Sequence, residues 1–145
     1  MEIKKASEKD VSWLDGVIST EFPYTGFSFF DIAHKISDSN YLVFCAFEKK
    51  KPVGFVELQF FSSDSSARLS AVFVEKKSRK KGIATKLAKK VLLECVKRKC
   101  GHVFLLVKEK NKVAKSFYKK LGFSFEKTHD KIIEESNVEV WSLNL

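Results

Sequence analysis

The segment at residues 79–84, Arg-Lys-Lys-Gly-Ile-Ala, has the residue types and spacing of an anion-binding loop. It lies between an apolar run that predicts a strand and an amphipathic pattern that predicts a long helix. Free backbone N–H groups and the positive end of the helix dipole favour an anion at such a helix start. Gly82 and the small Ala84 allow a phosphate to approach the backbone, and Lys80 and Lys81 add mobile positive charge together with Arg79. The loop therefore predicts a pyrophosphate site; the alternative is that its basic residues only solvate the helix start.

A second pattern falls on the next predicted helix. Asn111, Ala114, Phe117 and Tyr118 recur at helical spacing, and Leu-Gly-Phe at 121–123 ends the pattern. Asn111 has the side chain of a plain helix cap, and Phe117 fits a core position. Tyr118 carries a phenolic hydroxyl that can donate a proton, although a tyrosine beside Phe117 could also be buried for packing. The pattern by itself predicts a helix that Asn111 caps and that ends at Gly122.

Length and composition predict a single folded domain over residues 1–145. The chain has 145 residues, within the commonest domain size of about 100–150. Hydrophobic residues make up 44% and charged residues 31%, which excludes a mostly disordered chain. No apolar run approaches the roughly 20 residues of a membrane-spanning helix, and the first residues lack the apolar core of a secretion signal. We therefore expect a cytoplasmic protein without membrane contact.

The three cysteines, Cys45, Cys95 and Cys100, form neither a metal-type CxxC pair nor an even disulfide set. Cys45 falls inside a predicted strand, and Cys95 falls on the apolar side of a predicted helix. We therefore interpret all three as reduced, small hydrophobic residues of a cytosolic protein. Neither a metal ion nor a catalytic thiol is expected.

The net charge of +9 is compatible with a nucleic acid, an anionic lipid or a phosphate-bearing ligand as partner. It is also compatible with nothing more than a lysine-rich surface. The densest basic cluster, at residues 75–82, overlaps the predicted anion loop. No separate basic stripe with stacking aromatic residues remains for a nucleic acid. A nucleic-acid-binding module is therefore the weakest of the function hypotheses.

Apolar periodicity predicts strands and helices in the order β-α-α-β-β-β-α-β-α-β-β. The predicted strands cover residues 1–5, 41–48, 52–61, 67–74, 103–107, 123–128 and 138–143. Capping patterns at 7–10 and 28–31 open the first two helices, and Ile83 and Asn111 open the other two. This order predicts one α/β or α+β domain built on a mixed sheet.

Three local predictions concern how these elements end and pack. Gly101 is expected to stop the long helix that begins at Ile83. The run Val-Phe-Leu-Leu-Val at 103–107 is expected to form a strand buried on both faces, because its residues are continuously apolar. On the last helix, Val113 is expected to face the core.

The sequence resembles the GNAT superfamily of acetyl-CoA-dependent N-acetyltransferases in both motifs. The first is Arg79-x-x-Gly82-x-Ala84, and the second runs from Asn111-x-x-Ala114 through Phe117-Tyr118 to the glycine and phenylalanine at 122–123. The order of elements also suits that fold, so the resemblance covers essentially the whole chain; one departure is Lys76, where many members have proline. The resemblance implies a mixed, mostly antiparallel sheet of about six to seven strands with about four helices. Two central parallel strands would splay apart around the cofactor.

The resemblance implies that acetyl-CoA is the cosubstrate and that the loop at 79–85 wraps its pyrophosphate with backbone amides. The pantetheine arm would lie between the splayed strands, along 72–74 and 104–108. Asn111 would contact the cofactor near its thiol end. The implied cofactor-binding residues are Val72, Phe73, Val74, Arg79, Lys80, Lys81, Gly82, Ile83, Ala84, Thr85, Asn111, Ala114, Phe117 and Tyr118.

Acetyl transfer from a thioester to an amine needs a neutral amine, N–H donors for the oxyanion and a proton for the departing thiolate. The resemblance implies that Tyr118 is the general acid and that strand amides near 72–73 are the oxyanion donors. Many members keep a carboxylate or tyrosine at the strand position that corresponds to Ser70, and some N-terminal acetyltransferases add a histidine at the position that corresponds to Leu106. Neither residue can act as a base here, although Ser70 could order a water. Glu57, on the neighbouring strand, is the best remaining candidate base, and the alternative is an exposed edge charge.

The histidines His34, His102 and His129 are further candidate bases. His102 follows a helix-ending glycine and is expected at the surface. His129 lies in the last predicted loop, near the expected acceptor side. None of the three falls within either motif.

The acceptor is expected to be a primary amine of a peptide or protein. Phe22-Pro23-Tyr24 resembles the segment with which protein N-terminal acetyltransferases hold the first residue of a peptide; the alternative is that these aromatic residues cap the core. Phe22, Tyr24 and Ser70 are the candidate substrate-binding residues. Few carboxylates are expected at the acceptor mouth, which argues against a polyamine. A small-molecule amine acceptor and a non-catalytic acetyl-CoA-binding domain remain as alternatives, and the protein is expected to be a monomer or a homodimer.

Overall fold

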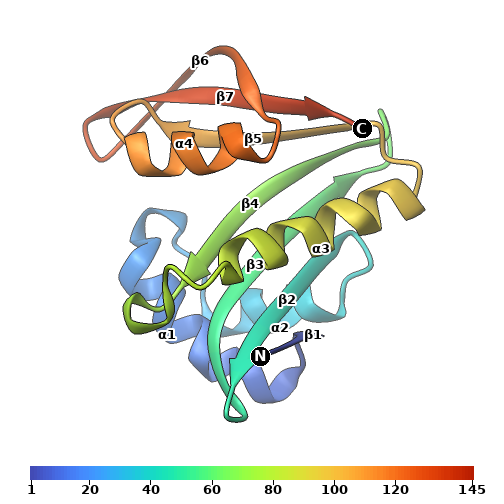
Figure 1. Cartoon of the computed structure of the whole chain (residues 1–145), viewed down its shortest axis with the longest axis vertical. Helices are drawn as coiled ribbons and strands as arrows, with labels where there is room; N and C mark the ends of the chain where they lie inside the picture. The colour runs from blue at the N-terminus through green and yellow to red at the C-terminus, as the bar shows by residue number, and fades with distance from the viewer.

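One continuous mixed sheet of seven strands forms the centre of the computed structural model, which describes residues 1–145 (Figure 1). The strands are β1 (Glu2–Lys5), β2 (Tyr41–Glu48), β3 (Lys51–Phe61), β4 (Ser66–Val74), β5 (His102–Lys108), β6 (Ser124–Ile133) and β7 (Ser136–Asn144). Their order across the sheet is β1-β2-β3-β4-β5-β7-β6, and only the β4–β5 pair is parallel. The predicted element order and the mixed, mostly antiparallel sheet are confirmed.

Four α-helices connect the strands: α1 (Val11–Glu21), α2 (Phe29–Ser37), α3 (Ile83–Lys97) and α4 (Lys112–Lys120). The predicted cap of α2 is present, because the Ser28 hydroxyl accepts the Asp31 N–H at 3.2 Å and the Asp31 carboxylate accepts the Ser28 N–H at 2.8 Å. Such reciprocal bonds satisfy donors that the first helical turn leaves free. None of the helices is both long enough and apolar enough to cross a membrane.

β4 and β5 are paired only at their first residues. The parallel register joins Ser66 to His102 and ends where Arg68 faces Phe104. Beyond that point β4 stays paired with β3 up to Val74, while β5 stays paired with β7. The two parallel strands therefore diverge into a fork, which confirms the predicted splay.

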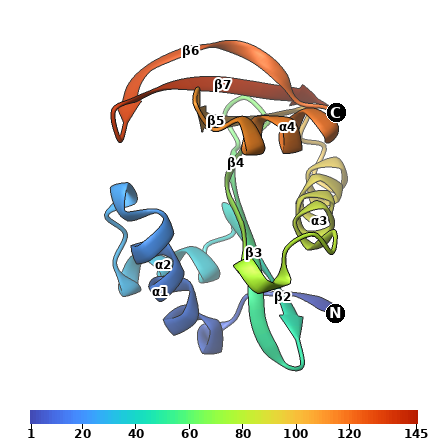
Figure 2. The same ribbon diagram turned by 60° about the vertical axis from the view of Figure 1, so that its left-hand side comes forward.

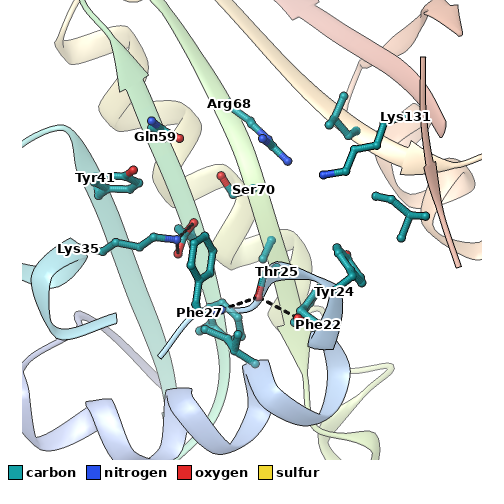
Figure 3. A pocket seen from close by; sticks show the side chains of 16 residues that line it. Phe22, Tyr24, Thr25, Phe27, Lys35, Tyr41, Gln59, Arg68, Ser70 and Lys131 are labelled. Carbon is teal, nitrogen blue, oxygen red and sulfur yellow. Dashed lines mark hydrogen bonds and ion pairs between the residues drawn. The ribbon is translucent and has the colours of Figure 1, made fainter. Parts of the chain in front are cut away.

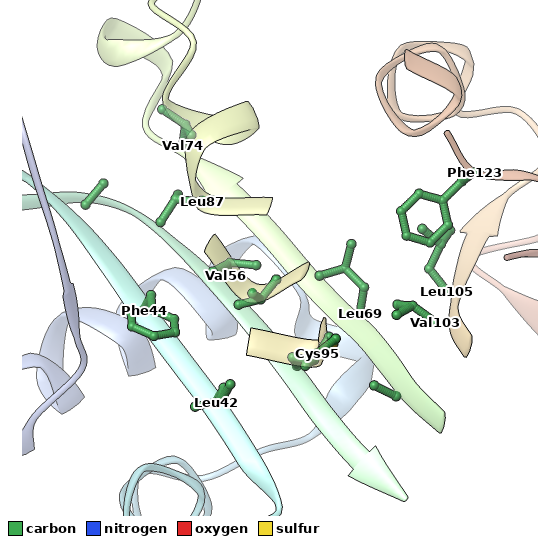
Figure 4. Close-up of a cluster of buried hydrophobic side chains, with 14 of the residues drawn as sticks. Leu42, Phe44, Val56, Leu69, Val74, Leu87, Cys95, Val103, Leu105 and Phe123 are labelled. Atoms are coloured by element: carbon green, nitrogen blue, oxygen red, sulfur yellow. The ribbon is translucent and has the colours of Figure 1, made fainter. Parts of the chain in front are cut away.

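Helices cover both faces of the sheet, but they cover different strands (Figure 2). α1 and α2 pack on one face through a cluster that includes Leu14, Ile32 and Phe55, and this cluster contains no residue of β5. α3 and α4 pack on the opposite face, over a larger core that extends from Leu42 to Phe123 (Figure 4). The face of β5 on the α1–α2 side is thus left outside either core.

The strand β5 corrects one prediction. Val103, Leu105 and Val107 are buried, whereas Phe104 and Leu106 are only half-buried, so the strand is not buried on both faces. The buried residues enter the core beneath α3 and α4. Leu106 lines a cavity on the other side, because no helix fills the space there. A continuous apolar run therefore serves a core on one face and a cavity wall on the other.

The end of α3 corrects a second prediction. Lys99, and not Gly101, takes the left-handed conformation that closes the helix, with φ 57°. The Cys100 N–H bonds to the Cys95 carbonyl oxygen and the Lys99 N–H bonds to that of Val96, which are the two bonds of a Schellman motif. Cys100 is buried and anchors the motif, so the turn forms without a glycine.

The C-terminal elements differ from prediction at two points. Val113 is 83% exposed, because the first turn of α4 extends past the core that Ala114 and Tyr118 reach. β6 continues to Ile133 instead of ending at 128, although its polar sequence shows no strand pattern. Pairing with β7 supports this extension, and it brings Lys131 towards the fork.

A β-bulge interrupts the β3–β4 pairing beside the fork. Glu57 pairs with Ala71 and Leu58 pairs with Leu69, so Ser70 is an extra residue on β4. Bulges re-aim neighbouring side chains and are frequent beside active sites. This bulge follows directly after the point where β4 leaves β5.

Candidate active site

Two cavities lie along β4, one at its C-terminal end and one beside the fork. The first has a volume of about 210 Å3 and forms where β4, the loop before α3 and the start of α3 meet. The predicted cofactor residues that line it are Val74, Arg79, Lys80, Gly82, Ile83, Ala84, Thr85 and Phe117. The structure therefore brings most of the predicted pyrophosphate loop together, and Phe117 of α4 lines this cavity.

The backbone around this first cavity offers hydrogen-bond donors without partners. None of the N–H groups from Lys80 to Thr85 donates a hydrogen bond within the protein. Lys80 (φ 65°) and Gly82 (φ 79°) adopt left-handed conformations that turn the chain into the helix. A Cβ atom on Gly82 would meet no atom within 4 Å, so the space beside it is open. Successive free amides at a helix start are the donors that a pyrophosphate requires.

Two side chains of this loop, those of Arg79 and Lys81, are anchored, so the prediction of mobile charge is wrong for these two residues. Arg79 Nε donates to the Val74 carbonyl oxygen at 2.8 Å, and Lys81 Nζ lies 3.3 Å from Glu48 Oε2. The Ser78 hydroxyl donates to Glu48 Oε1 at 2.8 Å, and this bond, with that from Lys81, lowers the pKa of Glu48. The loop is thereby tied to the ends of β2 and β4, so its free amides are held in position.

The second cavity, of about 230 Å3, lies between the fork and the segment that joins α1 to α2 (Figure 3). Phe22, Tyr24 and Ser70, the predicted substrate-binding residues, all line it, as does the candidate base Glu57. The Phe22 ring packs edge-on against Tyr24, at 6.5 Å between centroids, and against Phe55, at 6.2 Å. These aromatic residues thus form a cavity wall as well as covering the core.

Glu57 is buried in this second cavity and forms an ion pair. Lys35 Nζ, from α2, lies 3.3 and 3.2 Å from the two carboxylate oxygens, and each of the two side chains is 9% exposed. The ammonium also lies 3.4 Å from the centre of the Phe27 ring. The alternative of an exposed edge charge is therefore wrong, because Glu57 faces the cavity with its charge offset by Lys35.

Tyr118 lies between the two cavities, near a residue of each. Its ring is 5.3 Å from that of Phe117, which lines the first cavity. Burial raises the pKa of Tyr118 to about 12, and the neighbouring Tyr24 of the second cavity adds to the rise. The side-chain hydrogen bonds of α4 involve Asn111 and Lys115 but not the Tyr118 hydroxyl. Tyr118 is thus protonated at neutral pH and is not committed to a structural hydrogen bond.

Several predicted cofactor residues lie outside the linings of both cavities. Val72 and Phe73 lie on β4 between Ala71, which lines the second cavity, and Val74, which lines the first. Asn111 caps α4, since its Oδ1 accepts the Ala114 N–H at 3.0 Å. The others outside both linings are Lys81, Ala114 and Tyr118.

No histidine lines either cavity. His34 is exposed on α2, and the ring of His102 bonds to Asn144 Oδ1 at 2.9 Å. The ring of His129 accepts the Lys131 N–H at 2.9 Å. The histidines are therefore not placed to take a proton in the second cavity.

All three cysteines are free and buried, as predicted. Burial raises the pKa of Cys45 to about 12 and that of Cys95 to about 12. Thiols with such pKa values are protonated at neutral pH and are poor nucleophiles. These side chains are packing residues.

Sequence reasoning missed the basic side chains that line the second cavity: Lys35, Arg68 and Lys131. Lys35 follows Ile32 by one helical turn, and this inward position was an available signal. Arg68 lies between the buried Ala67 and Leu69, so strand alternation places it on the opposite face, with Ser70. For Lys131 the sequence offers no signal, because its polar neighbours predict a loop.

Comparison with known families gives one match, described as the Acetyltransferase (GNAT) family, over residues 9–123. No curated protein matches the sequence. The match covers the first cavity, the fork and both sequence motifs.

Solved structures with the same fold cover nearly the whole chain. PaiA N-acetyltransferase from Thermoplasma acidophilum, in complex with coenzyme A, is 23% identical, with a TM-score of 0.79 and 96% of each chain covered. Ribosomal-protein-alanine N-acetyltransferase from Brucella melitensis is 18% identical, with a TM-score of 0.83 and 100% of each chain covered. NAA60 from Arabidopsis thaliana, in complex with a bisubstrate analogue, is 15% identical, with a TM-score of 0.87, 99% of this chain and 97% of that chain covered.

Proposed function

The chain belongs to the GNAT family of acetyltransferases and is an acetyl-CoA-dependent N-acetyltransferase, and we propose that it acetylates a primary amine of a peptide or protein. The observation that carries this choice of acceptor is the aromatic cavity beside the fork. Its one carboxylate, Glu57, is already paired with Lys35, so the cavity offers no free negative charge. A polyamine with several positive charges would therefore find no counter-charge there.

One structural neighbour supports a protein acceptor. The Brucella melitensis enzyme is named as a ribosomal-protein-alanine N-acetyltransferase, and it aligns over 100% of this chain. We extend the domain to residues 1–145, beyond the matched 9–123, because β7 lies inside the sheet between β5 and β6.

The first cavity supports a path for acetyl-CoA. Amides from Lys80 to Thr85 would bind the pyrophosphate, since they have no partner within the protein. The pantetheine arm would follow β4 from Val74 to Val72, because past Arg68 the edge of β4 that faced β5 has no strand partner. The acetyl group would then reach the bulge at Ser70, which lines the second cavity.

Gly82→Val is expected to weaken acetyl-CoA binding at least tenfold, about 1.4 kcal/mol. Gly82 adopts φ 79°, which a β-branched residue rarely takes, and its open side faces no other atom. The change would therefore both shift the free amides and fill the space beside them. Titration calorimetry of acetyl-CoA measures the loss.

A matched control separates ligand contact from backbone strain. Gly26 also has a left-handed conformation, φ 65°, with no atom within 4 Å of a built Cβ, and it lies outside the first cavity. Gly26→Val should therefore keep the wild-type affinity for acetyl-CoA, as should Lys77→Ala, which removes only a solvated charge. Unchanged affinity in a folded Gly82→Val protein would contradict the proposed pyrophosphate site.

The proposed chemistry is direct attack of the neutral amine on the thioester. Amides near Val72 and Phe73 would stabilise the tetrahedral oxyanion, as their place between the two cavities supports. The Tyr118 hydroxyl would protonate the departing thiolate. Glu57 would accept the amine proton, directly or through a water held by Ser70, because both residues line the second cavity, which is the acceptor cavity of this proposal.

Glu57→Gln is expected to lower turnover most at low pH and to leave acetyl-CoA affinity intact. An amine with a pKa of about 10 is almost wholly protonated at neutral and lower pH, so the loss of a base matters most in that range. The fraction of neutral amine increases as the pH rises, so the difference in turnover between wild type and Glu57→Gln should become smaller. A pH–rate profile shows this; a variant that keeps the wild-type height and acidic limb would place the base elsewhere.

The acceptor is tested by measuring free CoA thiol with a panel of amines at saturating acetyl-CoA. The panel holds short peptides that differ in their first residue, a peptide with a blocked N-terminus and an internal lysine, and a polyamine. Turnover with the peptides and an added acetyl mass on them would support the proposal. Faster turnover with the polyamine would contradict it.

A second candidate function is a non-catalytic domain that binds acetyl-CoA. It is favoured by Ser70 and Leu106, which line the second cavity at the two positions where family members can carry a base, and neither of which can act as one. This candidate predicts that acetyl-CoA binds and that none of the amines raises thiol release above the background rate.

A further inference from the structure

The acceptor cavity contains more positive charge than its own residues neutralise. Lys35, Arg68 and Lys131 line it together with one carboxylate, Glu57. Lys35 is paired with Glu57, but no ion pair of the structure involves Arg68 or Lys131. Two cations therefore face the acceptor without a counter-charge.

Arg68 is also unsatisfied as a hydrogen-bond donor. Its Nε is a buried side-chain nitrogen without any hydrogen-bond partner. Arg68 is the last β4 residue paired with β5, at the base of the fork, and its side chain extends into the cavity on the side of Lys131 (Figure 3). Buried N–H groups are nearly always satisfied, so Arg68 Nε lacks the acceptor atom that a buried donor usually has.

We infer that the acceptor carries a carboxylate close to its reacting amine and that Arg68 and Lys131 bind this carboxylate. The inference rests on the proposed function, whose acceptor class it narrows. The guanidinium of Arg68 presents parallel donors that match a carboxylate, and Lys131 adds a point charge beside it. The rings of Phe22 and Tyr24 form the apolar part of the wall, against which aliphatic carbons of the same residue can pack.

Two sources could provide this carboxylate. One is the side chain of an acidic first residue of a peptide, and the other is the α-carboxylate of a free amino acid. Both place a carboxylate a few bonds from a primary amine. Short peptides with a free N-terminus and free amino acids distinguish the two sources directly.

The test compares kcat/KM for peptides identical except for a first residue of Glu, Gln or Lys, with free glutamate and free glycine as additional acceptors. We expect the Glu peptide to exceed the Gln peptide at least tenfold and the Lys peptide by more. In Arg68→Gln the Glu-to-Gln ratio should fall to within about twofold of unity, and Arg68→Lys should give an intermediate ratio. Preference for free glutamate and glycine over every peptide would assign the carboxylate to the amino-acid backbone and would contradict the peptide or protein acceptor of the proposed function.

Two controls separate loss of the carboxylate site from a general change in charge or stability. Lys127→Gln removes an exposed charge from the same strand as Lys131, outside the cavity, and should leave the Glu-to-Gln ratio unchanged. Thermal melting of each variant excludes unfolding as the cause of a lost preference. Equal wild-type rates with Glu and Gln peptides would overturn the inference and leave the proposed function intact. Thiol release with none of the amines, despite acetyl-CoA binding, would overturn the proposed function itself.

Discussion

Tyr118→Phe is expected to lower kcat about 100-fold, near the lower end of the 10²–10⁴-fold range for general acid–base catalysis. The substitution keeps the buried ring against Phe117 and Phe123 and removes only the hydroxyl. Burial raises the pKa of Tyr118 to about 12, so the hydroxyl is protonated across the working pH range. A thiol has an ordinary pKa of about 8.5, so complete proton transfer from this phenol is uphill, and the smaller effect is expected.

Steady-state rates, acetyl-CoA affinity and melting temperature of Tyr118→Phe belong to one experiment. Because Tyr118 makes no hydrogen bond to the rest of the protein through its hydroxyl, stability should change by less than about 1 kcal/mol. Affinity for acetyl-CoA should stay within a few-fold of wild type. Wild-type turnover in the variant would reject Tyr118 as the acid, and a loss of activity that follows melting would return it to a packing role.

Lys35→Met is expected to lower the free energy of unfolding by about 3–5 kcal/mol, a large share of the roughly 5–15 kcal/mol of a typical domain. The Met side chain keeps much of the apolar length of Lys35 but leaves the Glu57 carboxylate buried without its ammonium partner. Each of these two side chains is only 9% exposed, so water cannot replace the lost partner well. Urea denaturation followed by fluorescence measures the change.

Two comparisons isolate the buried pair as the cause. Lys97 forms an ion pair with Glu94, and the Lys97 side chain is 60% exposed. Lys97→Met should therefore lower the free energy of unfolding by less than about 1 kcal/mol. The double variant Lys35→Met with Glu57→Gln leaves no uncompensated charge and should recover most of the loss. A cost below about 1 kcal/mol for Lys35→Met would mean that the Glu57 carboxylate finds solvent or protonates.

Local patterns predicted the fold well because the signals and the structures they predict lie within a few residues of each other. The capping pattern at Ser28, the strand that begins at Tyr41 and the buried side of α3 formed by Leu87, Val91 and Cys95 are as expected, whereas Val96 at the end of the predicted apolar side is 57% exposed. The free amides of the loop from Lys80 to Thr85 were predictable for the same reason, since a helix start exposes its own amides. The end of α3 was not, because a buried Cys100 stabilises a left-handed Lys99 that no composition rule favours.

The acceptor side was less predictable because its side chains come from elements far apart in the sequence. Glu57 was singled out on β3 and lines the second cavity, but its partner Lys35 lies on α2, 22 residues away along the chain. Arg68 and Lys131 line the same cavity only because β4 diverges from β5 and β6 extends beyond its predicted end. The half-buried face of β5 was missed for the same reason, because the sequence of a strand does not show which of its two faces the helices leave uncovered.

One acetyl-CoA molecule is expected to connect the two cavities through the fork between β4 and β5. A crystal structure of the protein with bound acetyl-CoA tests this most directly. We expect its pyrophosphate oxygens within hydrogen-bond distance of the amides from Lys80 to Thr85 and its sulfur beside the Tyr118 hydroxyl. A pyrophosphate bound elsewhere, or a thioester that ends outside the fork and away from Tyr118, would contradict the account.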